Sequence, residues 1–201
     1  NRILSVTYLS DDGAISNIVE RVKTIPNRSH GNTPESVMGL NPDLVLISDF
    51  FPPESYQTLR DMGMKVYVYN TPSNFKEIKA SILELGQVVG ELEKGKQIVA
   101  EMDARIQKLQ EKLGNIKEKR KVLFMHAFGA YYSPKGTFGD TCSLAGVEDV
   151  TRSLNYSQPC TLSQETIVQL NPDSFVIGDW NFDGEHSPDA LKEELLSNQS
   201  Y

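Results

Sequence analysis

Short, unbroken apolar runs alternate along the chain with longer segments of helical periodicity. Such runs occur at 44–47, 65–69, 121–125 and 174–177. A run that does not alternate with polar residues is typical of a parallel strand covered on both faces. Strands that alternate with helices indicate parallel sheets built from βαβ units. We therefore predict an α/β fold.

Two segments repeat the same pattern, without a gap, at an offset of 130 residues. Residues 35–49 read ESVMGLNPDLVLISD, and residues 165–179 read ETIVQLNPDSFVIGD. Each copy predicts a short helix that ends at Asn-Pro-Asp, because proline lacks an N–H donor and restricts the residue before it. An apolar strand and an acidic residue follow. We interpret the copies as one unit present in both halves; the alternative is independent use of the same turn chemistry.

Between the two copies, apolar residues recur at every third or fourth position from Ile78 to Leu113. This spacing indicates amphipathic helices. We expect Gly90 and Gly95 to bracket the break between a first helix and a second helix over about 92–114. At 1.5 Å per residue the second helix spans roughly 30 Å and would act as a stiff spacer. We predict two lobes, each with a mainly parallel sheet flanked by helices, joined by one long α-helix.

The predicted organisation has three parts. The N-terminal lobe covers 1–75, the helices with the inter-lobe connector cover 76–118, and the C-terminal lobe covers 119–201. Residues 2–8 already read as a strand, so we expect that a leading segment has been removed or lies outside this sequence. Residues 187–201 predict only the start of a helix, so we expect the second lobe to be incomplete.

Composition and motifs exclude several classes of function. A net charge of −7 and a pI near 5.0 argue against a nucleic-acid partner. No apolar run approaches the roughly 18 residues that a membrane span needs. The chain contains no GxSxG, HExxH, P-loop or GxGxxG motif, and we predict that it is not an enzyme. Cys142 and Cys160 could form one disulfide in an exported protein or remain two buried thiols.

Polar and aromatic residues gather directly after the predicted strands, where open parallel sheets bind ligands. Aromatic faces with a few polar groups suit a large flat ligand. The candidate ligand-binding residues are Asp11, His30, Asp49, Phe50, Phe51, Asn70, His126, Phe128, Tyr131, Tyr132, Asp179, Trp180 and Asn181. For any one of them, packing within its own lobe is the alternative. A second alternative is a bare zinc, manganese or iron ion held by His30, His126 and His186 with a carboxylate.

Several segments, in this order, resemble the ABC-importer substrate-binding proteins that carry iron–siderophores, haem and cobalamin, the class III family with a long connecting helix. These segments are 8–17, 35–48, 59–67, 102–105, 135–146 and 165–177. The resemblance implies two α/β lobes and only slight closure on the ligand. It also implies a monomer on the periplasmic or extracellular face of the cell membrane, with or without a lipid anchor. The implied ligand is a ferric siderophore, haem or cobalamin, with no intrinsic cofactor.

The resemblance further implies a partner, a permease dimer with its ATPase subunits, which contacts one acidic residue on each lobe. Glu54 matches that position in the first lobe, and Glu148 or Glu165 could serve in the second. Ordinary exposed carboxylates are the alternative. The family's first strand–helix unit and its last strand and helix have no counterpart here, so some ligand contacts are expected outside this chain. The three-His-plus-carboxylate set of related metal receptors is not matched, which disfavours the bare-ion alternative. A further alternative function is a cofactor-dependent enzyme on a related two-lobe fold.

Overall fold

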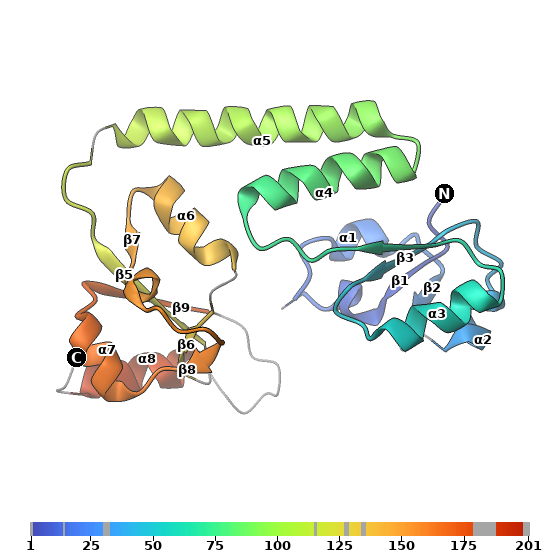
Figure 1. The fold of residues 1–201 in the computed structure, drawn as a ribbon. Helices are drawn as coiled ribbons and strands as arrows, with labels where there is room; N and C mark the ends of the chain where they lie inside the picture. Colours follow the sequence, from blue (N-terminus) through green and yellow to red (C-terminus); the bar gives the residue numbers. More distant parts are fainter. Residues whose placement is uncertain are drawn as a thin grey trace. The chain divides into compact units, whose positions relative to one another are not determined.

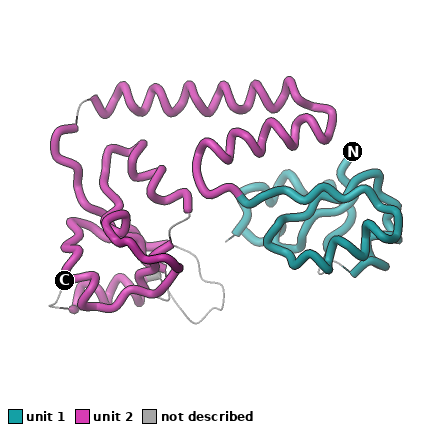
Figure 2. Tube along the Cα trace, viewed as in Figure 1, with its two compact units in different colours: residues 1–71 teal, residues 72–201 magenta. Residues whose placement is uncertain are grey.

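The computed structural model describes residues 2–13, 15–29, 33–114, 116–126, 129–133, 136–178 and 188–198. The chain divides into two compact units, residues 1–71 and 72–201 (Figure 2). The order of helices and strands along the chain is drawn in Figure 1. The long helices group with the second unit, while the predicted three-part division stays a prediction.

The first unit contains two small parallel sheets. Strand β1 (Ser5–Thr7) pairs with β2 (Asn27–Ser29), and β3 (Val45–Ser48) pairs with β4 (Val66–Tyr69). Each pair is connected through helical segments, as parallel pairing requires. These segments are η1 (Tyr8–Asp11) and α1 (Val19–Val22) in the first pair and α3 (Pro53–Asp61) in the second, with α2 (Pro34–Met38) between the two pairs. Leu59 of α3 is fully buried, and Ile47 of β3 is buried as well.

The second unit begins with the antiparallel helix pair α4 (Phe75–Val88) and α5 (Leu92–Leu113), which confirms the long helix predicted from periodicity. The prediction for Gly95 was wrong, because this residue lies inside α5. A β-carbon at Gly95 would come within 3.1 Å of the carbonyl oxygen of Ile82 in α4, so glycine lets the two helices approach closely. Gly90, with φ of 76°, forms the turn between them.

The sheet of the second unit is built around β5 (Lys121–His126). This strand pairs in parallel with β7 (Glu148–Asp149) and β9 (Ser174–Ile177), and antiparallel with β6 (Gly129–Tyr132), which pairs in turn with β8 (Cys160–Thr161). The sheet is therefore mixed: two of these strand pairs are parallel and two are antiparallel. The other elements are α6 (Thr137–Ala145), η2 (Val150–Ser153), α7 (Gln164–Leu170) and α8 (Pro188–Ser197). Leu123 of β5 is fully buried at the centre of the apolar core.

The two copies of the repeat have the same order of elements. The predicted helix end at Asn-Pro-Asp is confirmed for α7, whose cap is Asn171, and was wrong for α2, which already ends at Met38 with Gly39 as its cap. Each consists of a helix, α2 or α7, followed by a strand, β3 or β9, that pairs in parallel with a neighbour. Exposed apolar side chains also recur at the offset of 130 residues: Met38 and Val168 on the helices, and Leu46 and Val176 on the strands. Equivalent positions therefore face equivalent surroundings, as expected of one unit present twice.

Two further sequence questions are answered by the described residues. Within them, no helix combines the length and the apolar character that crossing a membrane requires. Cys142 in α6 and Cys160 in β8 are both free thiols, and only Cys142 is fully buried. The two cysteines are therefore not bonded in this structure, and the disulfide stays a prediction.

Candidate ligand-binding site

The carboxyl end of β3 is tied to the carboxyl end of β4 by a hydrogen-bonded network around Asp49. Its Oδ1 accepts from the Thr71 N–H at 2.9 Å and from the Thr71 hydroxyl at 2.7 Å, and its own N–H donates to the carbonyl of Tyr69 at 3.0 Å. The Thr71 bonds hold the pKa of the Asp49 carboxyl below its ordinary value, because they stabilise the charged form. Asp49 therefore fastens two strand ends together and carries a negative charge.

Phe50 and Phe51 follow this network and present aromatic surface to solvent. The Phe50 side chain is 88% exposed and that of Phe51 is 42% exposed. Their rings meet edge to face with centroids 6.2 Å apart. The Phe50 N–H donates to the Ser48 hydroxyl at 3.1 Å, which ties the turn to the end of the strand. A nearly fully exposed Phe ring is a candidate contact for an apolar or flat ligand.

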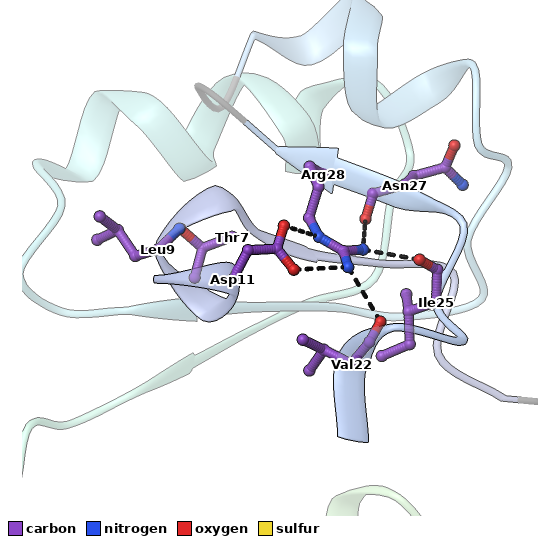
Figure 3. Close-up of polar contacts among 7 residues, drawn as sticks. All are labelled: Thr7, Leu9, Asp11, Val22, Ile25, Asn27 and Arg28. Carbon is purple, nitrogen blue, oxygen red and sulfur yellow. Dashed lines mark hydrogen bonds and ion pairs between the residues drawn. The ribbon is translucent and has the colours of Figure 1, made fainter. Parts of the chain in front are cut away.

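Asp11, at the end of η1, is held by Arg28 of β2 (Figure 3). The guanidinium donates through Nε to Asp11 Oδ2 and through Nη2 to Oδ1 at 2.8 Å. It also donates to the carbonyls of Val22, Ile25 and Asn27, so that all five N–H donors are used. The bonds from Arg28 lower the pKa of Asp11. Asp11 thus has a structural role in linking η1, α1 and β2, whether or not a ligand also reaches it.

Two other predicted residues of the first unit lie on the surface. Asn70 is exposed directly after β4. Glu54 is exposed in the first turn of α3, at the N-terminal end of that helix. A carboxylate there is favoured by the partial positive charge of the helix N-terminus. Both side chains are therefore available for contacts with a ligand or a partner.

Aromatic rings gather at the carboxyl end of β5 in the second unit. The half-buried His126 lies edge to face with Phe124 at 4.6 Å between centroids and with Tyr131 of β6 at 6.4 Å. Phe124 also contacts Phe138 of α6, at 5.1 Å. Phe124 and His126 share one face of the strand because side chains two residues apart point the same way. Sequence reasoning missed Phe124 and Phe138; the same alternation along β5 and the glycines beside Phe138 were the available signals.

Tyr131 and Tyr132 lie on opposite faces of β6. Tyr131 is 43% exposed, whereas Tyr132 is 7% exposed and belongs to the core. The Tyr132 hydroxyl donates to the carbonyl of Tyr156 at 3.2 Å, and the two rings pack edge to face. Of the two predicted tyrosines, only Tyr131 shares a cluster with His126. Tyr132 has the core role that was its alternative interpretation.

The remaining predictions divide into two groups. Glu148 at the start of β7 and Glu165 in the first turn of α7 are exposed, and Glu165 accepts from Gln169 at 3.3 Å. Six predicted site residues lie outside the described residues: His30, Phe128, Asp179, Trp180, Asn181 and His186. Within the described part of the chain, no three His, Cys, Asp or Glu side chains are grouped in a way that could hold a metal ion.

Comparison with known proteins assigns the family. The profile of the periplasmic binding protein family matches residues 7–201. The chain belongs to this family. The match confirms the resemblance noted from the sequence segments. The exposed aromatic side chains at the strand ends thus belong to a member of a family of binding proteins.

Two curated relatives and one solved structure are similar to this chain. An uncharacterized ABC transporter substrate-binding lipoprotein, YvrC, of Bacillus subtilis strain 168 is 29% identical over 152 residues, which cover 72% of this chain and 48% of that protein. A cobalamin-binding protein of Halobacterium salinarum is 27% identical over 149 residues, covering 72% and 40%. A possible iron-binding, periplasmic solute-binding protein of Staphylococcus epidermidis has the same fold, with a TM-score of 0.77, 16% identity, and coverage of 98% and 75%. The chain thus spans less than half the length of these two curated relatives.

Proposed function

We propose that this chain captures a metal chelate outside the cytoplasm and delivers it to an ABC importer. The family match over residues 7–201 supports a binding role. The similarity to a substrate-binding lipoprotein supports a binding protein that works with an ABC importer outside the cytoplasm. The similarity to a cobalamin-binding protein supports a large metal-containing ligand. In this proposal the chain binds its ligand without chemical conversion and keeps no cofactor of its own.

The observation that carries the proposal is the 88% exposed ring of Phe50 on a hydrogen-bonded turn at the end of a parallel strand. Burying a Phe side chain is worth about 1.5–3 kcal/mol, so a ligand that covers the exposed Phe50 ring would gain a contribution of that order. Ligands of α/β sheets bind beyond the carboxyl ends of strands, which is where Phe50 lies. A corrin, a porphyrin or a catecholate offers the flat surface that such a ring can cover.

The second unit offers a ligand similar chemistry. Tyr131 supplies an exposed ring, and His126 adds an imidazole that can donate, accept or bind a metal. Asn70 and Phe51 complete the described candidates for direct contact. Trp180, His30, Phe128, Asp179 and Asn181 stay predictions from the sequence. A ferric siderophore, haem and cobalamin all remain within this proposal.

The importer partner would be a permease dimer with its ATPase subunits. Glu54, Glu148 and Glu165 are exposed, so each can form an ion pair with a basic residue of another protein. Exposed pairs contribute little singly, about 0–1 kcal/mol, and they set orientation and association rate more than affinity. We propose that these carboxylates orient the chain on the permease.

Binding titrations test the proposal. The chain is titrated with hemin, cyanocobalamin and a ferric tris-catecholate, while the emission of the single tryptophan and the absorbance of each probe are followed. At least one probe should bind, and Phe50→Ala should weaken it about tenfold or more, as expected for losing about 1.5–3 kcal/mol of apolar burial. Phe50→Tyr keeps the ring and is the control. Absence of binding for all three probes, or full binding by Phe50→Ala and Tyr131→Ala alike, would contradict the proposal.

A further inference from the structure

The turn after β3 is held by several hydrogen bonds beyond the β3–β4 ladder. The β3–β4 ladder pairs Ser48 with Tyr69 at its last position. Beyond that pair, Asp49 bonds to the Tyr69 carbonyl through its N–H and to the Thr71 N–H and hydroxyl through Oδ1. These added bonds join the two segments that leave the sheet, so neither can move without the other.

Ser48 connects this network to Phe50. Its hydroxyl lies 3.1 Å from the Thr71 hydroxyl and 3.4 Å from Asp49 Oδ1, and it accepts the Phe50 N–H at 3.1 Å. One continuous set of hydrogen bonds therefore runs from Thr71 through Asp49 and Ser48 to the backbone of Phe50. Phe51 is held in the same turn, because its N–H donates to the Ser48 carbonyl at 3.2 Å.

We propose that Thr71, Asp49 and Ser48 form a positioning network that holds the Phe50 ring in its exposed, ligand-ready orientation. In this role Asp49 acts through Phe50 and not as a direct ligand contact. The inference rests on the proposed function, since it assigns Phe50 to the ligand. It adds Thr71 and Ser48, which are not among the candidate ligand-binding residues, to the residues that determine affinity.

The physical reason is preorganisation. A turn that is mobile before binding must be ordered when the ligand arrives, and ordering a side chain costs about 0.5–1.5 kcal/mol. A turn already fixed by Asp49 and Thr71 avoids that cost. The charged carboxylate strengthens the bonds it accepts, because charge-assisted hydrogen bonds are shorter and stronger than neutral ones. Loss of any member should therefore weaken binding without unfolding the unit, since the whole network lies near the surface.

The experiment compares four single variants with wild type: Asp49→Ala, Ser48→Ala, Thr71→Val and Thr71→Ser. Affinity is measured for whichever of hemin, cyanocobalamin and the ferric tris-catecholate binds wild type, together with the melting temperature and the amide exchange rates of Phe50 and Thr71. We expect the first three variants to raise Kd about threefold to tenfold, which is the cost of ordering the turn. Thr71→Ser keeps the hydroxyl and should bind like wild type.

Two double variants show whether the effect is transmitted as proposed. Asp49→Ala with Thr71→Val should bind no worse than Asp49→Ala alone, because members of one network are not additive. In a Phe50→Ala background, Thr71→Val should have no further effect on Kd. If Asp49→Ala weakens binding while Thr71→Val and Ser48→Ala leave it unchanged, Asp49 contacts the ligand itself and the inference is overturned.

The amide exchange rates separate this inference from the proposed function. If wild type binds none of the three probes, the proposed function fails, and the network is judged from exchange alone. Faster exchange at Phe50 in both Asp49→Ala and Thr71→Val, with wild-type rates in Thr71→Ser, supports the network. Unchanged exchange at Phe50 in Asp49→Ala and Thr71→Val overturns it, with or without a bound probe.

Discussion

Asn41 and Asn171 adopt the same left-handed backbone conformation, each with φ of 46°, at equivalent positions of the internal repeat. Among the described residues they are the only ones other than glycine with positive φ. Asn171 is the C-terminal cap of α7, where its N–H donates to the carbonyls of Ile167 and Val168. Asn41 lies two residues after Gly39, the cap of α2, and its N–H donates to the carbonyl of Met38. Asparagine tolerates this conformation better than other side chains that carry a β-carbon. The repeated Asn-Pro-Asp therefore encodes one helix-to-strand turn in both units.

Because of this left-handed conformation, we expect substitution of Asn171 by alanine and by glycine to change the free energy of unfolding by different amounts. Asn171→Ala should lower the free energy of unfolding by about 1 kcal/mol, because alanine in the left-handed region costs roughly 1–2 kcal/mol. Asn171→Gly should change it by only a few tenths, since glycine adopts this region freely. Urea unfolding measures both, and Asn41 offers the same comparison in the first unit. Equal effects of Ala and Gly would mean that the conformation is not what selects asparagine.

Leu59 and Leu46 give a matched pair in the first unit. Leu59 is fully buried, whereas Leu46 on β3 is 46% exposed. Leu59→Ala should therefore destabilise by about 2–5 kcal/mol, through lost burial and the cavity left behind. Leu46→Ala should cost about 0.5 kcal/mol or less, as is usual for surface positions. Chemical denaturation of both variants checks the difference; a similar loss for both would show that Leu46 is covered in the folded protein.

Asp11 predicts a loss of stability at acid pH. Arg28 lowers the folded-state pKa of Asp11 below its ordinary value of 3.8, so the unfolded chain takes up the proton first as the pH falls. This contribution is present above the ordinary pKa and is lost as the pH falls through the folded-state value. The melting temperature of wild type should therefore fall more steeply below pH 4 than that of Asp11→Asn.

The pKa of Asp49 is also lowered, because Thr71 donates hydrogen bonds to its carboxylate. Asp49→Asn should therefore remove a separate part of the fall in melting temperature at acid pH. The double variant Asp11→Asn with Asp49→Asn should have the melting temperature that depends least on pH. Arg28→Lys is a further control for the Asp11–Arg28 pair, because lysine keeps the positive charge but cannot supply five donors in a planar fork. An acid profile of Asp11→Asn that follows wild type at every pH would show that the Arg28 pair makes no net contribution.

Much of the fold could be predicted because its signals are local. Pro42 and Pro172 each lie between a helix and a strand, and the apolar runs after them form strands as the pattern indicated. Gly95 was misjudged because its role is not local. Its neighbour in space is Ile82, on the other helix of the pair, and no pattern around Gly95 reveals that contact.

The candidate site was predicted less completely for the same reason. Placing Asp49 and Phe50 at a strand end followed from the pattern, but the partners of each side chain did not. Thr71 lies 22 residues from Asp49 along the chain, and Arg28 lies 17 residues from Asp11. Whether a carboxylate faces a ligand or bonds to the protein depends on such distant partners.

Tyr131 and Tyr132 are a different case, because alternation along a strand already requires that they point to opposite faces. Sequence reasoning could have predicted that only one of them faces solvent, although not which one. The core position of Tyr132 is decided by the packing around β6, where Tyr156 supplies both a ring and a carbonyl acceptor.

Cys142 and Cys160 should differ sharply in reactivity. Burial raises the pKa of the Cys142 thiol to about 11, with a further rise from the nearby Asp149 charge and an opposing effect of Arg152. At pH 8 only about one Cys142 in a thousand is then a thiolate, the reactive form. Cys160 is half-buried at the start of β8. A maleimide or an aromatic disulfide should therefore label native Cys160 first.

Single-cysteine variants make this difference measurable. Cys142→Ser leaves Cys160 and should react in the folded state. Cys160→Ser leaves Cys142 and should react much more slowly at pH 8, because burial raises the pKa of Cys142 and covers its thiol. In denaturant both should react fully and at similar rates, because burial no longer protects Cys142. Equal native rates would contradict the burial of Cys142, and a native protein lighter by two hydrogen atoms with no reactive thiol would show a disulfide in place of the two free cysteines.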